Sequence, residues 1–552
     1  MTIDSLTPTL SQREREQCES SIGLCHVTPG SYSRSELLAK TPAVGVPFPV
    51  SGASALAKRF ALDEIMSAPS LDFRFSKTKI IATVGPACET REKLKALVDA
   101  GVDIFRLNFA HGKHDWLHGL VGLIRSISTE IQRPIGILGD LSGPKIRLGA
   151  LPGGSFVCEL GATVEFVRGE QSETPGRLTC TYEQLIDDVR AGDRILMADG
   201  TVSLKVVEPN AAAGWVRCVV DGNGEIRSRQ GVNLPGVALS TPSLTDKDRE
   251  DLAWALEHEL DFIGLSFVRC SADVRLLREV IEAAKPKFTP LIVSKIEKLE
   301  AINDLDGILA ETDAVMVARG DLGVEVDIAR VPVLQKKIIK ACNLQRIPVI
   351  TATQMLDSMQ HNELPTRAEV TDVANAVIDG SDAVMLSGET AVGEYPVGAV
   401  RMMNRVACEA EQLVESSQFR TRSAPMKAQA LLVTEAVTRG AGAAAEHLKA
   451  SVIAVASRTG LTAMALSNQR ISVPIIAVSD RPEIARRMCL FWGVTPVLTD
   501  TRTVGNAEPL LRYVVDWGKR QHIVQSGGRI ILIAATNWSD EGHDLMMVHM
   551  VP

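Results

Sequence analysis

Residues 79–108 read KIIATVGPACETREKLKALVDAGVDIFRLN, and this stretch decides the fold. It begins with a short β-rich run, KIIATV (79–84), continues through a helix-length segment, TREKLKALVDAG (90–101), and ends in a second run, DIFRLN (103–108). Alternation of strand and helix indicates parallel strands joined by right-handed crossovers. The stretch therefore predicts one strand–helix–strand unit of an α/β fold.

The same alternation recurs along the chain. Besides the two runs above, the strand-like runs are IGILGD (135–140), FIGLSF (262–267), LIVSKIE (291–297), AVMVARG (314–320), PVITATQ (348–354) and AVMLSGE (383–389). Eight such units predict a closed (β/α)8 barrel, whose chemistry lies at the carboxyl ends of its strands.

The rest of the chain predicts three further parts around this barrel, which occupies 76–142 and 243–420. Residues 143–242, rich in Gly, Val, Thr and turn signals, predict a β-barrel lid domain inserted after the third strand. Residues 421–552 predict an open α/β sheet domain, with parallel strands at 452–457, 474–479, 496–500 and 529–534 and an antiparallel edge at 546–551. Residues 1–75 lack sustained periodicity and predict a poorly ordered extension.

The composition narrows the class of protein. A net charge of −8 argues against nucleic acid or an anionic membrane as the main partner. The ten cysteines show no C-x-x-C spacing, and no run approaches the ~20 apolar residues that span a membrane. We therefore expect a cytoplasmic enzyme.

Polar residues stand where the predicted strands end. They are Arg106, Asn108, Asp140, Lys295, Glu297, Arg319, Gly320, Asp321, Thr353, Gln354, Ser387 and Glu389. Because the carboxyl ends of barrel strands meet on one face, we expect these residues to converge into an active site.

The residue types in this set point to metal-assisted phosphate chemistry. Glu297 and Asp321 offer hard oxygen ligands on neighbouring strands, which favours Mg²⁺ or Mn²⁺ with room left for substrate oxygens. Lys295 beside the metal would neutralise a developing oxyanion, and Arg106 and Arg147 would bind phosphoryl oxygens. The alternative for Lys295 and Glu297 is a buried ion pair with no catalytic role.

The chain resembles pyruvate kinases over roughly residues 76–552. The matching motifs are KTKIIATVGPA, FRLNFAHG, GVNLPG, SKIEKLEAINDLDGIL, VMVARGDLGVE, PVITATQMLDSM and PTRAEVTDVANAVIDGSDAVMLSGETAVGEYP. The resemblance implies transfer of the phosphoryl group of phosphoenolpyruvate to ADP, giving pyruvate and ATP in the last step of glycolysis. It also implies a homotetramer.

The resemblance also implies roles for individual residues. Glu297 and Asp321 would hold the metal, while Arg106 and Lys295 would stabilise the phosphoryl group and the enolate. The substrate carboxylate would bind Gly320, Asp321 and Thr353, and a proton would reach the enolate through Thr353, Ser387 and Glu389. The residues that would face the nucleotide are Asn108, Phe109, Ala110, His111 and Arg147.

The stretch GDLSGPKIRLG (139–149) departs from the common family pattern D-T-x-G-P-E-I-R. Ala110 replaces a serine that holds potassium, Leu141 replaces the threonine, and Lys145 replaces the glutamate. The sequence is similar to the potassium-independent subset of the family, so we expect Lys145 to act as a built-in monovalent cation against Asp140. The alternative is that Lys145 points to solvent at the lid hinge.

In this family the C-terminal sheet domain binds a phosphorylated allosteric effector. Here the loop VASRTGLTA would cradle its phosphate through Ser457, Thr459, Gly460 and Thr462, unless these residues merely cap a helix. The acidic loop with Asp540, Glu541 and Asp544 would repel a second phosphate, which favours a monophosphate.

Two other functions fit parts of the sequence. A metal-dependent aldolase or lyase acting on a pyruvate enolate would share the carboxylate ligands and the cation, but it would not need a lid or Arg147. A non-catalytic paralogue that senses sugar phosphates would not need Lys295, Glu297, Asp321 and Thr353 together.

Overall fold

The structure is a computed structural model that describes residues 76–169, 171–237, 239–414, 431–535 and 543–552. The chain divides into two compact units, Met1–Asp72 and Phe73–Pro552, and every described residue belongs to the second. The extension predicted over 1–75 lies outside the described residues.

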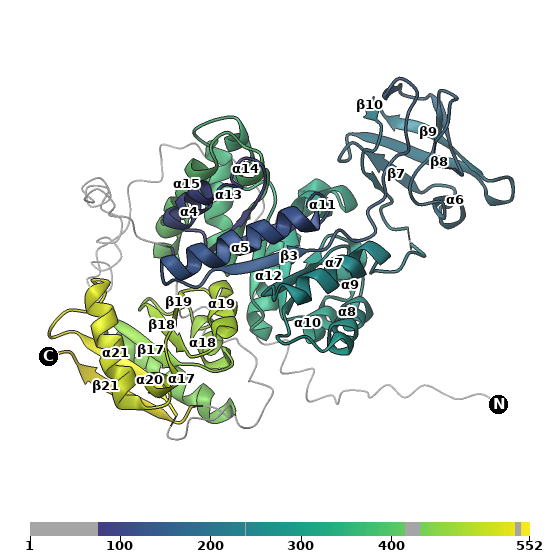
Figure 1. Cartoon of the computed structure of the whole chain (residues 1–552). Coiled ribbons are helices and arrows are strands. Elements are labelled where there is room, and N and C mark those ends of the chain that lie inside the picture. The colour runs from purple at the N-terminus through teal and green to yellow at the C-terminus, as the bar shows by residue number, and fades with distance from the viewer. Residues whose placement is uncertain (1–75, 170, 238, 415–430, 536–542) are drawn as a thin grey trace, which may run out of the picture. The chain divides into compact units, whose positions relative to one another are not determined.

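The centre of the fold is a closed barrel of eight parallel strands, labelled in part in Figure 1. The strands are β1 (Lys79–Thr83), β2 (Ile104–Asn108), β3 (Gly136–Asp140), β12 (Phe262–Leu265), β13 (Leu291–Ile296), β14 (Ala314–Ala318), β15 (Val349–Ala352) and β16 (Ala383–Leu386). They follow one another around the barrel in chain order, and β16 pairs with β1 to close it. The predicted (β/α)8 barrel is confirmed, with one strand in each of the eight predicted runs.

Helices separate the strands and cover the outside of the barrel. They are α4 (Arg91–Ala100), α5 (His114–Glu130), α7 (Asp246–Glu257), α8 (Ser271–Ala284), α9 (Leu299–Asn303), α10 (Leu305–Glu311), α11 (Arg319–Glu325), α12 (Val331–Gln345), α13 (Arg367–Ile378), α14 (Gly388–Ala391) and α15 (Pro396–Ala410). Capping boxes start α7, at Thr245, and α13, at Thr366, and they fix where these helices begin.

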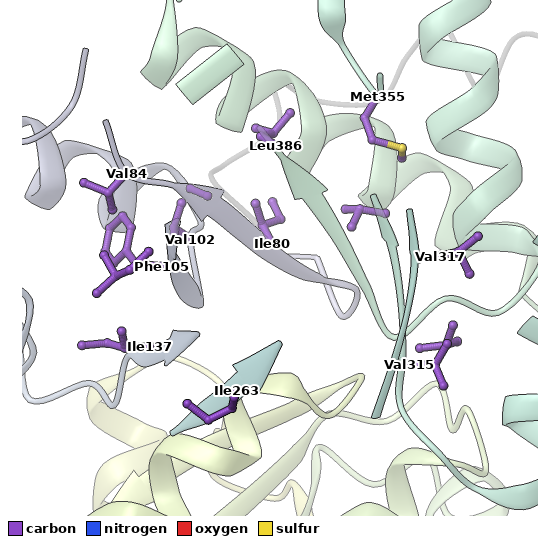
Figure 2. Packing of buried hydrophobic residues seen from close by; sticks show 14 of the residues in the cluster. Ile80, Val84, Val102, Phe105, Ile137, Ile263, Val315, Val317, Met355 and Leu386 are labelled. Carbon is purple, nitrogen blue, oxygen red and sulfur yellow. The ribbon is translucent and has the colours of Figure 1, made fainter. Parts of the chain in front are cut away.

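Alternation of side chains along the strands builds two cores. One set, which includes Ile80, Phe105, Ile137 and Ile263, packs against the helices, and Figure 2 shows part of this cluster. The other set fills the barrel interior and is continuous with the core of the C-terminal domain. Its barrel members include Ile81, Ile104, Leu138, Phe262, Val293, Met316, Ile350 and Met385.

Four aspartates, each just before a strand, cap the amino end of the barrel. Each carboxylate accepts a hydrogen bond from an N–H at the start of the preceding strand: Ile80 to Asp103 (3.0 Å), Ile137 to Asp261 (2.9 Å), Ile292 to Asp313 (2.9 Å) and Val349 to Asp382 (2.8 Å). Each also pairs with an arginine, as Arg133–Asp103, Arg125–Asp261, Arg278–Asp313 and Arg470–Asp382. Arg486 adds a second partner for Asp261, so Arg470 and Arg486 of the C-terminal domain bind this end of the barrel.

The inserted β domain after the third barrel strand is confirmed. Its elements are β4 (Ser155–Cys158), β5 (Thr163–Val167), β6 (Arg177–Leu178), α6 (Leu185–Asp188), β7 (Arg194–Met197), β8 (Val202–Asn210), β9 (Trp215–Gly222), β10 (Gly224–Arg227) and β11 (Val232–Asn233). Within the described residues these strands form a six-stranded sheet and a two-stranded β10–β4 sheet around one core. Bridges from Arg147 to Gly231 and from Leu148 to Cys180 link the two edges of the six-stranded sheet. Gly222 and Gly224 pass close to β8, where a side chain would clash, and they turn the chain from β9 into the second sheet.

The C-terminal domain has the predicted open sheet, in the order β19-β18-β17-β20-β21. Its strands are β17 (Val452–Ala456), β18 (Ile475–Ser479), β19 (Val494–Leu498), β20 (Arg529–Ala534) and an antiparallel β21 (Leu545–Met550). Its helices, labelled in Figure 1, are α17 (Leu431–His447), α18 (Leu461–Ser467), α19 (Pro482–Arg487), α20 (Thr501–Val504) and α21 (Ala507–Arg520). No helix in the described part of the chain is long and apolar enough to cross a membrane.

Candidate active site

The inward positions of the barrel change from apolar to polar along the strands. Ile104 precedes Arg106, Leu138 precedes Asp140, and Val293 precedes Lys295, each at a spacing of two residues. The apolar members fill the barrel interior, so the charged members all lie toward the carboxyl ends of the strands.

Asp140 is the centre of this charged cluster and is 2% exposed. Arg106 donates to its Oδ2 atom from Nε (2.8 Å) and contacts the same atom through Nη2 (2.5 Å). Burial alone would raise the pKa of Asp140, but Lys295 and Arg106 outweigh burial and lower it. Asp140 therefore stays ionised and fixes the guanidinium of Arg106.

Lys295 reaches Asp140 across a strand that lacks a side chain at this level. β12 lies between β3 and β13, and a Cβ on its Gly264 would stand only 2.7 Å from Asp140 Oδ1. Through this gap Lys295 Nζ lies 3.4 Å from Asp140 Oδ2, 2.9 Å from Glu297 Oε1, and donates to Ser266 Oγ (2.7 Å). Burial would lower the pKa of Lys295, but the two carboxylates raise it above its usual range, so the ammonium stays charged.

Glu297 and Asp321 fit a sparse site for a divalent cation. Glu297 is 1% exposed, and its Oε2 accepts a hydrogen bond from the N–H of Phe267 (2.7 Å). Burial raises the pKa of Glu297, and repulsion from Asp321 adds to the rise. The carboxylate of Asp321 makes no hydrogen bond or ion pair with any residue that the structure describes. A hard cation would relieve the repulsion between these carboxylates and leave positions for water and substrate.

The described residues contain no group of three or more histidine, cysteine, aspartate or glutamate side chains that could hold a metal. A cation at Glu297 and Asp321 would therefore need further ligands from water or substrate, as Mg²⁺ commonly does.

Thr353 lies beside Gly320 at the ends of β15 and β14. The N–H of Gly320 donates to Thr353 Oγ1 (2.8 Å), and Thr353 and Gln354 have left-handed backbone conformations, with φ of 67° and 52°. The guanidinium of Arg319 supports this turn by donating to the carbonyl oxygens of Thr353 (2.7 Å) and Gln354 (3.1 Å). The Arg319–Gly320 sequence thus serves to shape the backbone around Thr353.

Ser387 and Glu389 follow β16, and Glu389 is almost fully buried. Its carboxylate accepts hydrogen bonds from the N–H groups of Ser387 (2.7 Å) and Leu356 (3.1 Å), and burial raises its pKa. Glu389 therefore links the segments that follow β15 and β16. A role of Ser387 and Glu389 in proton delivery stays a prediction.

The loop after β2 contains the residues predicted to face the nucleotide. The N–H of Ala110 donates to Asn108 Oδ1 (3.1 Å), which forms a tight turn. Ala110 and His111 are exposed, but the side chain of Phe109 is 1% exposed and packs against Trp254 and His114. The prediction for Phe109 is therefore wrong for its side chain. Because Asn108 points inward, the next side chain points outward into the helix layer.

Lys145 lies at the root of the inserted domain and is exposed. The expected contact with Asp140 is not formed, because Asp140 is paired with Arg106 and Lys295, while the chain turns away at Gly143, which has φ of 65°. The Cε atom of Lys145 instead lies beside Gly231, 3.7 Å from where a Cβ on that glycine would stand. Burial lowers the pKa of His111, and the charges of Arg147, Lys145 and Arg106 lower it further.

A large pocket of about 1230 Å³ lies between the inserted domain and the barrel. Lys145 and Arg147 line it from the inserted side, and Gly320, Asp321 and Gln354 line it from the barrel side. It therefore brings the phosphate-binding candidate Arg147 and the metal candidate Asp321 into one space.

All four residues of the predicted effector loop take part in hydrogen bonds within the protein. Ser457 Oγ accepts the N–H of Gly460 (3.0 Å), and Thr462 Oγ1 is bonded to His543 Nδ1 (2.8 Å). Thr459 is exposed, and its Oγ1 accepts the N–H of Leu461 (3.4 Å). Asp540 and Glu541 lie outside the described residues, so the monophosphate effector stays a prediction.

Comparison with known proteins agrees with this geometry. A model for the barrel domain of pyruvate kinase matches residues 75–400, and a model for its alpha/beta domain matches residues 435–549. Pyruvate kinase of Staphylococcus epidermidis is 40% identical over 480 residues, covering 86% of this chain and 80% of that protein. Pyruvate kinase 2 of Synechocystis sp. is 41% identical over 486 residues, covering 86% and 79%.

A crystal structure of a pyruvate kinase from Cryptosporidium parvum matches with a TM-score of 0.82 at 36% identity, covering 89% of this chain and 99% of that one. Both family models follow the described domains in order, and the relatives match over most of their length. The chain therefore belongs to the pyruvate kinase family of phosphotransferases.

Proposed function

We propose that this protein transfers the phosphoryl group of phosphoenolpyruvate to ADP with the help of a divalent cation, giving pyruvate and ATP. The observation that carries the proposal is the buried cluster in which Asp140 and Glu297 hold Lys295 and Arg106 through contacts of 2.5 to 3.4 Å. Such fixed cations suit phosphoryl transfer, which needs positioning and charge neutralisation more than covalent chemistry.

In the transfer, the bond between phosphorus and the enol oxygen breaks, and its electron pair stays on that oxygen. A β-phosphate oxygen of ADP forms the new bond to phosphorus. Lys295, kept cationic by its two carboxylates, would neutralise the enolate oxygen, and Arg106 would bind the phosphoryl oxygens during transfer. The enolate carbon then takes up a proton, which gives pyruvate.

Glu297 and Asp321 would hold the cation, Mg²⁺ or Mn²⁺. When bound, the cation neutralises substrate charge and orients the substrate oxygens. Gly320 and Thr353, which are hydrogen-bonded to each other, would lie against the substrate carboxylate beside Asp321. The proton would pass through water near the hydroxyl groups of Thr353 and Ser387, with Glu389 holding the backbone of Ser387 in place.

Asn108, Ala110, His111 and Arg147 would bind the nucleotide, together with the backbone of Phe109, and among these residues Arg147 lines the pocket between the two domains. Arg147 is suited to a phosphate because its guanidinium lines the pocket and donates only to the carbonyl oxygen of Arg229 (3.3 Å) among the described residues.

The test is to incubate the purified protein with phosphoenolpyruvate and ADP, with Mg²⁺ or with a chelator, and to measure ATP and pyruvate separately. We expect equal amounts of both products with Mg²⁺ and neither with the chelator. Pyruvate and inorganic phosphate without ATP would show hydrolysis in place of transfer to ADP. No reaction with Mg²⁺ would contradict the proposal and favour a lyase acting on a pyruvate enolate or a non-catalytic paralogue.

We further propose that catalysis does not need potassium, because Lys145 supplies a fixed positive charge near the Asn108–His111 loop. Activity with Mg²⁺ in tetramethylammonium buffer should then match activity with added potassium. Lys145→Glu should reduce catalysis sharply, and potassium should rescue it only in part. A parent enzyme that is nearly inactive until potassium is added would contradict the proposal.

A further inference from the structure

A second buried ion pair is formed by residues that lie close in the chain to the metal-site carboxylates Glu297 and Asp321. Lys298 Nζ contacts Glu325 Oε1 at 2.5 Å, and the two side chains are 8% and 1% exposed. Lys298 follows Glu297 in extended backbone, so the two side chains leave the chain on opposite sides. Glu325 stands four residues after Asp321 on α11, on the same face of the helix. The ion pair therefore links the residue after Glu297 to the residue one helical turn after Asp321, and these two carboxylates are the ones expected to hold the cation.

The ammonium of Lys298 has a second contact that leads back to Glu297. It lies over the ring of Phe267, 5.9 Å from the ring centre, and the N–H of Phe267 donates to Glu297 Oε2 at 2.7 Å. Phe267 holds this N–H in place with a left-handed backbone, at φ of 55°. A non-glycine residue in that conformation is strained and needs support from its surroundings.

The energetics argue against a role in stability alone. Replacing a buried ion pair by neutral side chains of similar size is often neutral or stabilising, because desolvation offsets the attraction between the charges. Burial raises the pKa of Glu325, and the nearby charges of Glu300 and Asp321 oppose the effect of Lys298, so the position is costly for a carboxylate. Its Oε2 atom is buried and has no hydrogen-bond partner among the described residues.

We propose that Lys298 and Glu325 are positioning residues, which set the separation of Glu297 and Asp321 and so preorganise the cation site. This inference rests on the proposed function, because it takes Glu297 and Asp321 as the cation ligands. Residues that orient metal ligands typically change metal affinity about 10- to 100-fold when replaced.

The test uses the full chain and measures binding of Mn²⁺ alone by electron paramagnetic resonance, without nucleotide or phosphoenolpyruvate. The double variant Lys298→Met/Glu325→Gln removes the pair and keeps the net charge. We expect its dissociation constant for Mn²⁺ to rise about tenfold with little change in the unfolding midpoint. The Mg²⁺ concentration needed for half-maximal activity should rise as well, while the KM for ADP stays constant.

Arg278→Met/Asp313→Asn is the matched control, since it removes a pair next to β13 and β14 at the opposite, amino end of the barrel. We expect it to bind Mn²⁺ as the parent does. If the double variant does not fold, Glu325→Asp keeps both charges and shortens one side chain, and it should still weaken Mn²⁺ binding.

Glu297→Gln separates failure of this inference from failure of the proposed function. If Glu297→Gln loses Mn²⁺ while the folded pair variants bind it like the parent, the positioning role is overturned and the cation site stands. If Glu297→Gln also binds like the parent, the cation site is overturned, and the positioning role with it.

Discussion

Both ends of the barrel carry buried charged side chains but use them differently. At the amino end, Asp103, Asp261, Asp313 and Asp382 each bind a backbone N–H and an arginine. At the carboxyl end, Asp140 Oδ1 is buried with no hydrogen-bond partner among the described residues, and Asp321 has no ion pair there. The amino end is complete without a ligand, whereas the carboxyl end leaves charge for substrate and cation to complete.

The largest effect should come from removing a charge at the carboxyl end. Lys295→Met should lower kcat by about 10²–10³ or more, because the cation that neutralises the developing enolate is lost. The methionine still packs, so circular dichroism should show a folded protein, with a lower unfolding midpoint because two buried carboxylates lose a partner. Near-normal turnover in this variant would contradict the proposed mechanism.

The corresponding change at the amino end should affect stability instead. Arg470→Met leaves Asp382 buried and unpaired, which should cost about 3–5 kcal/mol in the free energy of unfolding. The kcat per folded molecule should not change, because Arg470 binds the end of the barrel away from the site. Arg512→Met removes an exposed pair with Glu508 and should cost at most about 1 kcal/mol. A large loss of kcat at unchanged stability in Arg470→Met would break the comparison between the two ends.

An added methyl group at the carboxyl end should also act on catalysis more than on folding. Gly264→Ala places a Cβ 2.7 Å from Asp140 Oδ1, so the carboxylate must shift from the position in which its Oδ2 contacts Arg106 and Lys295. We expect kcat to fall roughly 10- to 100-fold, since small misplacements of reacting groups are costly. Gly119→Ala in α5 meets open space and should leave kcat as in the parent. Equal activity of the two variants would show that the gap at Gly264 is not needed.

The smallest effect is a change in the pKa of His111. Burial and the charges of Arg147, Lys145 and Arg106 lower this pKa, so the imidazole gives up its proton more readily than usual. Lys145→Met removes one positive charge, which should raise the pKa, as measured by nuclear magnetic resonance of the imidazole. Lys113→Met removes a lysine from the same loop and serves as the control. An unchanged pKa in Lys145→Met would place Lys145 too far away to act near the nucleotide loop.

Much of the fold could be predicted because the barrel strands are short, buried and regularly spaced. The inward positions of Arg106, Lys295 and Glu297 follow from a period of two, and their placement at strand ends predicts that they converge. The same periodicity assigns the side chain of Phe109 to the outer layer, where it is buried. The predicted contact of Phe109 with the nucleotide overlooks this periodicity, because it extends the binding segment without a break from the end of β2 into the loop.

The partners of Asp140 could not be predicted from neighbours in the chain. Its contact with Lys295 crosses an intervening strand, and the only signal in the sequence is the missing side chain in FIGLSF, at Gly264. The contact between Lys298 and Glu325 likewise depends on how α11 packs after β14, and the sequences around these two residues do not indicate that packing. The expected contact of Lys145 with Asp140 follows from charge and from the linked changes at Ala110 and Leu141, but the turn at Gly143 directs Lys145 elsewhere.

The aspartates at the amino end divide the barrel into four modules of two consecutive strands. Asp103 joins β2 to β1, Asp261 joins β12 to β3, Asp313 joins β14 to β13, and Asp382 joins β16 to β15. The inserted domain interrupts the second module at its carboxyl end, so none of these four hydrogen bonds is disturbed. A barrel of this kind can therefore accept a whole domain at that position. A circularly permuted chain with new ends at residues 285–290, between the second and third modules, would keep the two partners of each of these four hydrogen bonds in one unbroken stretch of chain.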